Sequence, residues 1–299
     1  MDPNYTPLAQ SLLFLTTVDA LIRMLFVEGF GVCVILLVGN SFRWWSEAAA
    51  TRSPLREKLL RSPGESLRRT LEQLNEYLIY SVAVFLLVPM FFAWQAPILT
   101  NFWAVAFLAG LMGLCALPGL FVVRLYRSCA LSLRGERAVG EELNQLMLDG
   151  CHVFHDYPTG KDSTIDHIVV APSGVYAIET RTRLKRSAPE GEEQHEVIFD
   201  GRTLRFPNCT TAEPIKEARK RAADLSRQLS SSVGELVEVK PVLTLPGWRI
   251  RDRGTSDVLV VNAKEIWQRI VTPAPPELCA AQIKGIAYHV QQKCRDVEI

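Results

Sequence analysis

The sequence predicts N-terminal transmembrane α-helices followed by an α/β domain with a mixed central sheet. Three observations lead to this prediction. No Asp, Glu, Lys or Arg occurs between Tyr77 and Val123, whereas the chain after Arg124 is charged almost throughout. Beyond residue 135, helical periodicity alternates with short runs of β-branched and aromatic residues. A length of 299 residues leaves room for about two domains.

The overall composition excludes several classes of protein. The chain carries 33 Lys and Arg against 32 Asp and Glu, so a globally basic nucleic-acid binder is excluded and any polyanion site must be a local patch. Its seven cysteines include no C-x-x-C pair, which argues against a zinc site and against a disulfide framework. The uneven distribution of charge excludes both a purely soluble and a purely membrane-embedded protein.

Residues 1–40 contain a possible first membrane helix. Met24–Gly39 is apolar but short, and it includes Glu28, which would cost about 2.5–3.5 kcal/mol at mid-membrane. An interfacial or helix-packed segment is the alternative. Residues 41–76 are predicted to form a cytosolic helical segment, an amphipathic helix pair broken at Ser62-Pro63-Gly64.

The uncharged stretch is predicted to form a transmembrane hairpin over residues 77–124. Tyr77–Ala96 and Phe102–Val123 are each long enough to span about 30 Å of hydrocarbon. Trp94 and Trp103 fall at the same end of the two segments, as interfacial tryptophans do. The alternative is a buried helical hairpin of a soluble protein.

Positive charges flank this hairpin on both sides and predict its orientation. Basic residues in short flanking loops stay in the cytosol, so both ends of the hairpin are expected there. The expected location is a bacterial-type inner (cytoplasmic) membrane, with the lipid bilayer as a partner. The basic residues before the hairpin are Arg43, Arg52, Arg56, Lys58, Arg61, Arg68 and Arg69, and those after it are Arg124, Arg127 and Arg134.

Residues 135–299 are predicted to form the cytosolic α/β domain. A helical stripe of apolar residues begins after Gly135 and stops at Gly150. Three runs rich in β-branched and aromatic residues follow it, and the last two are joined by the turn Ala171-Pro172-Ser173-Gly174. The predicted strands are His152–Asp156, Ile165–Val170 and Val175–Thr180.

The register of the last two strands predicts a pair of opposed carboxylates. If the turn closes symmetrically, Val170 faces Val175 and Asp166 faces Glu179, with Arg181 further along the same face. Carboxylates directly opposite in a sheet repel each other unless a cation compensates them. Mg²⁺ or Mn²⁺ would do so and could activate water for attack on a phosphodiester. The alternative is an exposed pair satisfied by water or by a nearby arginine.

Several sequence blocks carry a resemblance to a known family. They are GERAVGEEL, HDYP, STIDHIVVAPSGVYAIETRTR, EPIKEARKRAADLSRQL, VKPVLTLPGWRI and VLVVNAKEI. Together, over roughly residues 135–270, they resemble the nuclease-related (NERD) domain, a relative of the PD-(D/E)XK nucleases. The resemblance implies a restriction-endonuclease-like core in which a helix acid, a strand-end Asp and an E-x-K pair hold the metal and the attacking water.

The resemblance also assigns site residues. The helix acid is Glu136, although Glu141 and Glu142 compete for that role; the strand-end acid is Asp166 and the E-x-K acid is Glu179. Asp166 and Glu179 would be the metal ligands. Arg181 stands at the Lys position, where a guanidinium can clamp a phosphate but cannot lose its proton. The family's Asn-Pro and Gln are replaced by Glu213-Pro214 and Glu217.

The block after Pro214 predicts a helix with a stripe of basic residues. Lys216, Lys220 and Arg227 are the candidate nucleic-acid contacts, since a stripe of this kind can follow a phosphate backbone; a solvated face is the alternative. His167 is expected to be a packed or supporting histidine rather than a ligand. Three functions remain open: a membrane-tethered, metal-dependent nuclease; a catalytically weakened nucleic-acid-binding module; and a module that docks a protein partner of unknown identity.

Overall fold

The structure is a computed structural model that describes residues 58–94, 102–160, 163–185, 195–270 and 276–297. The predictions for Met24–Gly39 and for the joint of the hairpin lie outside these residues. The chain divides into two compact units, Met1–Arg56 with Ile299 and Glu57–Glu298. Every described residue belongs to the second unit.

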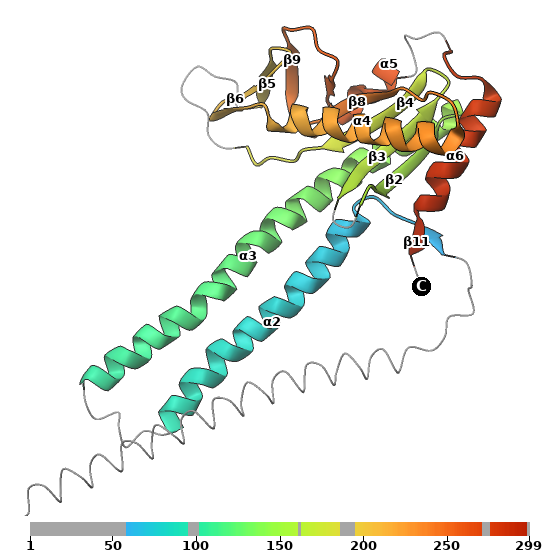
Figure 1. The fold of residues 1–299 in the computed structure, drawn as a ribbon. Helices are drawn as coiled ribbons and strands as arrows, with labels where there is room; N and C mark the ends of the chain where they lie inside the picture. The colour runs from blue at the N-terminus through green and yellow to red at the C-terminus, as the bar shows by residue number, and fades with distance from the viewer. Residues whose placement is uncertain (1–57, 95–101, 161–162, 186–194, 271–275, 298–299) are drawn as a thin grey trace, which may run out of the picture. The chain divides into compact units, whose positions relative to one another are not determined.

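Two long helices, α2 (Glu65–Trp94) and α3 (Phe102–Gln145), lie side by side (Figure 1). Both are long and apolar enough to cross a membrane, and their apolar windows are not covered by other parts of the protein. The structure thus has two helices where the transmembrane hairpin is predicted. The helix α3 continues without a break past residue 124, so the predicted helix before Gly150 is its C-terminal end.

The end of α3 shows why glycine is needed there. A short 3₁₀ segment, η2 (Leu146–Asp149), follows the helix, and Gly150 closes it with a φ of 79°. This left-handed conformation is open to glycine at little cost, and its N–H satisfies carbonyls of the last turn. Gly150 therefore ends the helix, as the sequence predicts.

The prediction of a helix pair within residues 41–76 is wrong at Leu59–Leu60. These residues form a short strand, β1, that pairs antiparallel with β11 (Arg295–Val297) near the C-terminus. Pairing with a distant strand overrides the local helical periodicity. The helix expected after Ser62-Pro63-Gly64 is present, because Gly64 has a φ of 74° and α2 begins directly after it.

A mixed five-stranded sheet forms the centre of the domain, in the order β10-β8-β4-β3-β2. The strands β2, β3 and β4 are antiparallel neighbours, whereas β4, β8 and β10 run parallel. The mixed α/β class is confirmed. The strands are β2 (His152–Pro158), β3 (Thr164–Ala171), β4 (Gly174–Thr180), β8 (Val239–Thr244) and β10 (Leu259–Val261).

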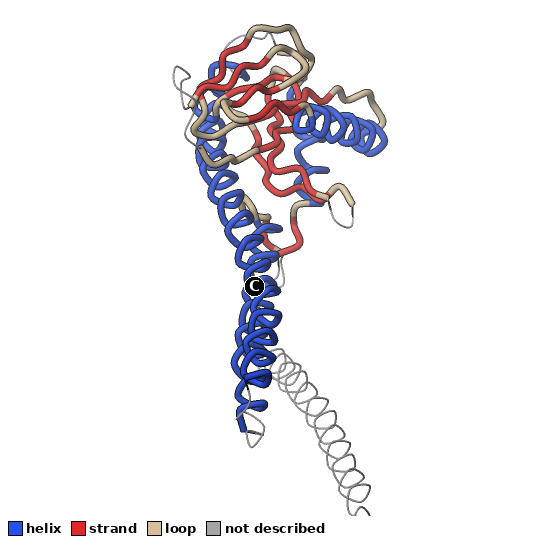
Figure 2. The backbone as a smooth tube through the Cα atoms, turned by 90° about the vertical axis from the view of Figure 1, so that its left-hand side faces the viewer, coloured by secondary structure: helices blue, strands red, loops and turns tan. Residues whose placement is uncertain are grey.

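Helices cover both faces of this sheet, and a second sheet packs beside it (Figure 1). The strands lie between helices on either side in Figure 2. The second sheet has the order β7-β6-β5-β9. Its strands are β5 (Glu196–Phe199), β6 (Leu204–Phe206), β7 (Cys209–Thr211) and β9 (Arg249–Asp252); the remaining helices are α4 (Glu213–Val233), η3 (Ala263–Glu265), α5 (Ile266–Ile270) and α6 (Ala280–Lys293).

Side chains alternate between two cores along the central strands. In β4, Val175 and Ala177 pack against α4 and α6, whereas Tyr176 and Ile178 pack against α3 and α5. This is the period of two expected of a strand buried on both faces. Glu179 continues the face of Val175 and Ala177, which directs its side chain toward α4.

Candidate active site

The β3–β4 hairpin brings Asp166 and Glu179 to the same end of the sheet. The pairing begins with Ala171 opposite Gly174, continues with Val170 opposite Val175 and runs to His167 opposite Ile178. The predicted register is therefore confirmed along the paired length. Asp166 and Glu179 are the next residues of the two strands, directly beyond the last pair.

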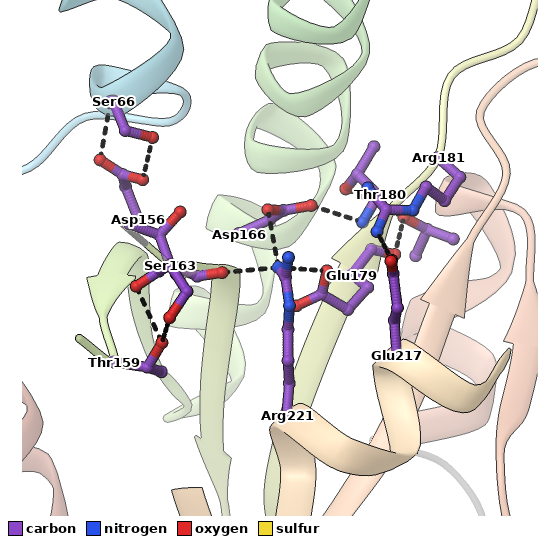
Figure 3. Close-up of polar contacts among 12 residues, drawn as sticks. Ser66, Asp156, Thr159, Ser163, Asp166, Glu179, Thr180, Arg181, Glu217 and Arg221 are labelled. Atoms are coloured by element: carbon purple, nitrogen blue, oxygen red, sulfur yellow. Dashed lines mark hydrogen bonds and ion pairs between the residues drawn. The ribbon is translucent and has the colours of Figure 1, made fainter. Parts of the chain in front are cut away.

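An arginine from α4 compensates these two carboxylates (Figure 3). The Nη1 of Arg221 donates to Glu179 Oε2 at 2.6 Å and lies 3.9 Å from Asp166 Oδ1. The same nitrogen donates to the carbonyl oxygen of Thr164 at 2.6 Å. Asp166 Oδ2 accepts the backbone N–H of Thr180 at 2.7 Å. Of the alternatives left open by the sequence, a nearby arginine is the partner that the structure shows.

A third acid, Glu136, approaches from α3. Gly135 makes this approach possible, because a Cβ at that position would lie 1.7 Å from the hydroxyl oxygen of Thr182, just past the end of β4. Glu136 is buried, while Glu141 is exposed and Glu142 is half-buried. Of the three helix acids considered from the sequence, Glu136 is thus the buried one, and the charges of Asp166 and Glu179 act on it.

Burial and mutual repulsion raise the pKa values of all three acids. Burial is the main cause, and together with the charges of Asp166, Asp156 and Glu179 it raises the pKa of Glu136 to about 9. Burial likewise raises the pKa of Glu179 to about 8 and that of Asp166 to about 6, although Arg221 opposes the shift in both. The site therefore holds more acid than its arginines neutralise.

The arginine at the Lys position of the motif lies at the edge of this site. Arg181 donates through Nη2 to Glu217 on α4 (Figure 3). The Arg181 side chain is 37% exposed, compared with 26% for Arg221. The cation in direct contact with the acids is therefore Arg221, and Arg181 faces the solvent side.

Comparison with known families finds one match within the chain. Residues 131–246 match the family model of the nuclease-related domain (NERD). No curated protein and no solved structure matches the chain. The matched segment extends from the C-terminal part of α3 past β8 and includes all three acids and both arginines of the site.

Arg221 is a residue of the acid site that was not predicted from the sequence. A local signal exists, because Arg221 lies three residues after Ala218 and four before Leu225, both buried on the inner face of α4. An arginine at the edge of a buried helical face is positioned to reach the sheet. The strand that receives it cannot be known from that helix alone.

Asp156 is a second residue of the nuclease-related domain that sequence reasoning missed. It is buried, and its φ of 53° makes it the only residue other than glycine with a positive φ among those described. Its carboxylate accepts the N–H of Ser66 at 2.8 Å and the Ser66 hydroxyl at 2.6 Å (Figure 3). Arg61 also donates to it. Asp156 therefore caps the first turn of α2 from a residue distant in sequence.

The predicted nucleic-acid residues lie on the outer side of α4. Lys216, Lys220 and Arg227 are all exposed, and Arg227 pairs with Asp224 in the same helix. They share the helix with Arg221 but do not contact the acids. A path for a phosphate backbone along this surface stays a prediction.

A buried histidine pair lies on β2 and β3 of the nuclease-related domain. The Nδ1 atoms of His155 and His167 are 2.9 Å apart, and His155 Nε2 lies 3.1 Å from Asn144 Oδ1. Because the asparagine oxygen can only accept, His155 Nε2 carries the proton and His155 Nδ1 accepts from His167. Burial lowers the pKa of His155 to about 4 and lowers that of His167 as well. Both histidines are therefore neutral, packed residues.

Proposed function

We propose that the nuclease-related domain hydrolyses phosphodiester bonds of nucleic acid with a divalent cation, Mg²⁺ or Mn²⁺. The observation that carries this proposal is the buried carboxylate pair of Asp166 and Glu179 at one end of the sheet, bordered by Arg221 and Arg181. The buried acid Glu136 of α3 lies near enough for the charges of this pair to raise its pKa. Buried acids with strongly raised pKa values are more typical of a catalytic or binding site than of a purely structural one. The match to the nuclease-related domain supports the same class of function.

The donor atoms at this site fit a hard divalent cation. Carboxylate oxygens are the ligands that Mg²⁺ prefers. Within the described residues, Glu179 Oε1 is buried without a hydrogen-bond partner, so this oxygen is available to bind a cation. No group of three His, Cys, Asp or Glu is already assembled as a metal site in the described ranges. Asp166 and Glu179 would hold the cation, and Glu136 would complete the set from α3.

Each group has a defined task in this proposal. A bound cation would polarise the phosphate and activate a water molecule. Without a cation Glu136 keeps a proton at neutral pH because its pKa is raised, and it would release that proton on completing the ligand set. Arg181, at the exposed edge, binds a phosphate oxygen of the substrate. Glu217 would have to release Arg181 for that contact.

A second candidate function is nucleic-acid binding without turnover. The observation that favours it is the ion pair between Arg181 and Glu217. Arg181 stands where the motif has a lysine, and this pair already engages its side chain. A guanidinium retains its proton, whereas a buried lysine can lose one. The single substitution Arg181→Lys therefore tests whether the domain is a binder or an enzyme.

We also propose that α2 and α3 tether the domain to the cytosolic side of a bacterial-type inner membrane. Large apolar side chains are exposed along both helices, among them Tyr77, Ile79, Leu114 and Phe121. Apolar surface of this extent is unfavourable in water, and contact with lipid would remove it from water.

The test is cleavage by the full chain in lipid nanodiscs. Fluorescently labelled single-stranded and duplex DNA and RNA are incubated with Mn²⁺, Mg²⁺ or EDTA. We expect metal-dependent cleavage that is lost in Glu179→Gln and retained in Glu141→Gln, a matched change of an exposed acid on α3. Equal activity in Glu179→Gln would refute the assignment of the site.

Arg181→Lys separates the two candidate functions. If the wild-type chain binds nucleic acid but does not cleave it, and Arg181→Lys cleaves, the domain is a binder that retains the architecture of an enzyme. Cleavage by the wild-type chain that falls in Arg181→Lys establishes Arg181 as an adapted residue of an active nuclease. Neither binding nor cleavage in any variant would reject both functions in favour of a protein-docking role.

A further inference from the structure

Arg221 occupies the position at which a cation would neutralise Asp166 and Glu179. Its Nη1 is 2.6 Å from Glu179 Oε2 and 3.9 Å from Asp166 Oδ1, so one guanidinium nitrogen serves both carboxylates. Few positions are available for a positive charge at a buried acid pair, and two cations in direct contact with the same oxygens would repel each other.

The contacts of Arg221 fix it firmly in this place. The third contact of Nη1, to the carbonyl oxygen of Thr164 at 2.6 Å, is made to the same strand that carries Asp166. Glu179 is 1% exposed, so little water competes for the ion pair. The other arginine of the site, Arg181, pairs with Glu217, and among the described residues it forms no ion pair with Asp166 or Glu179.

We propose that Arg221 is a built-in counter-ion that competes with a divalent cation for Asp166 and Glu179 and so sets the metal affinity of the site. The inference rests on the proposed function for its metal site, but it concerns a residue that the motif does not include. The metal binds when Arg221 leaves the carboxylates, and Arg221 compensates part of their charge when no metal is present. The guanidinium thereby limits occupancy to conditions in which the cation is abundant.

The proposal predicts that removing Arg221 strengthens metal binding. Mn²⁺ binding is measured by electron paramagnetic resonance of the free ion with the full chain in nanodiscs, so no activity is needed. We expect Arg221→Gln to bind Mn²⁺ at least about tenfold more tightly than the wild-type chain, because the competing charge is gone. Arg219→Gln is the matched control, an exposed arginine of α4 that pairs with Asp257 away from the acids, and it should leave the Mn²⁺ affinity unchanged.

Two further variants keep the test decisive. Glu179→Gln in the Arg221→Gln background should abolish the strengthened site; if it does not, the Mn²⁺ lies elsewhere and the proposal fails. If Arg221→Gln does not fold, Arg221→Lys replaces it. The shorter, more strongly hydrated ammonium should hold the pair less well and tighten Mn²⁺ binding by about threefold.

The outcomes also separate this inference from the proposed function. Equal Mn²⁺ affinity in the wild-type chain and Arg221→Gln, or weaker affinity in the variant, would overturn the role of Arg221 while leaving the metal site intact. Absence of Mn²⁺ binding in both would overturn the inference and the metal dependence together. Tighter binding without cleavage would support the inference and count against the nuclease.

Discussion

Replacing Glu136 by glutamine should stabilise the domain in a strongly pH-dependent way. The acid is buried on α3, and among the described residues no ion pair joins it to a basic side chain within 4 Å. Its pKa is raised from 4.5 to about 9, mainly by burial. In metal-free buffer the folded chain therefore keeps this proton at neutral pH, whereas the unfolded chain releases it.

The sign and size of the effect follow from proton linkage. Because the folded state binds more protons than the unfolded state between pH 4.5 and about 9, the free energy of unfolding falls as pH rises through that window. The loss is about 1.4 kcal/mol for each pH unit, or about 3 kcal/mol between pH 4.5 and pH 7. Glutamine has no proton to keep, so the variant does not undergo this loss.

The assay compares melting temperatures of wild type and Glu136→Gln from pH 4.5 to pH 8 in EDTA, by intrinsic fluorescence of the full chain in nanodiscs. The advantage of the variant should grow by about 6–12 °C between pH 4.5 and pH 7, at 2–4 °C for each kcal/mol. Glu141→Gln, at an exposed position of the same helix, should show no such trend. A pH-independent difference, or an advantage that shrinks as pH rises, would refute the reasoning.

Three further predictions address the structure around the site and the orientation of the chain in the membrane. Ser66→Ala removes the hydroxyl that donates to Asp156 at 2.6 Å and should lower the free energy of unfolding by about 1.5–3 kcal/mol; an unchanged melting temperature would show that this cap adds little. Gly135→Ala places a Cβ 1.7 Å from the Thr182 hydroxyl and should cost about 1–3 kcal/mol, whereas Gly113→Ala in the same helix meets nothing within 4 Å and should be tolerated. An alkaline phosphatase fused to the C-terminus, active only after export, should stay inactive; high activity would reverse the proposed orientation.

Local patterns were sufficient to predict the β3–β4 hairpin. Alternating β-branched residues and the turn Pro172-Ser173 define both strands and their register, since a one-residue shift would exchange the two buried faces. The positions of Asp166 and Glu179 follow directly from that register. The end of α3 at Gly150 is a local feature of the same kind, because only the last turn and its glycine are involved.

The partners of these acids depend on contacts between residues distant in sequence. Arg221 meets Glu179 across 42 positions, and Asp156 meets Ser66 across 90. The pairing of Leu59–Leu60 with β11 joins the two ends of the described chain. The contacts of Asp156 and of β1 leave no periodic trace in either segment alone, and the helical position of Arg221 does not indicate which strand receives it. The sequence therefore predicts the acids of the site but not the cation that contacts them.

The most direct test of the proposed active site is the location of a metal ion. Crystals of the full chain grown with MnCl₂ and recorded near the manganese absorption edge would show the ion by its anomalous signal. We expect a peak in contact with the oxygens of Asp166 and Glu179, with Arg221 moved away from both. No peak at this position, with Arg221 still donating to Glu179 at saturating Mn²⁺, would contradict the proposal that these acids form a metal-dependent hydrolytic site.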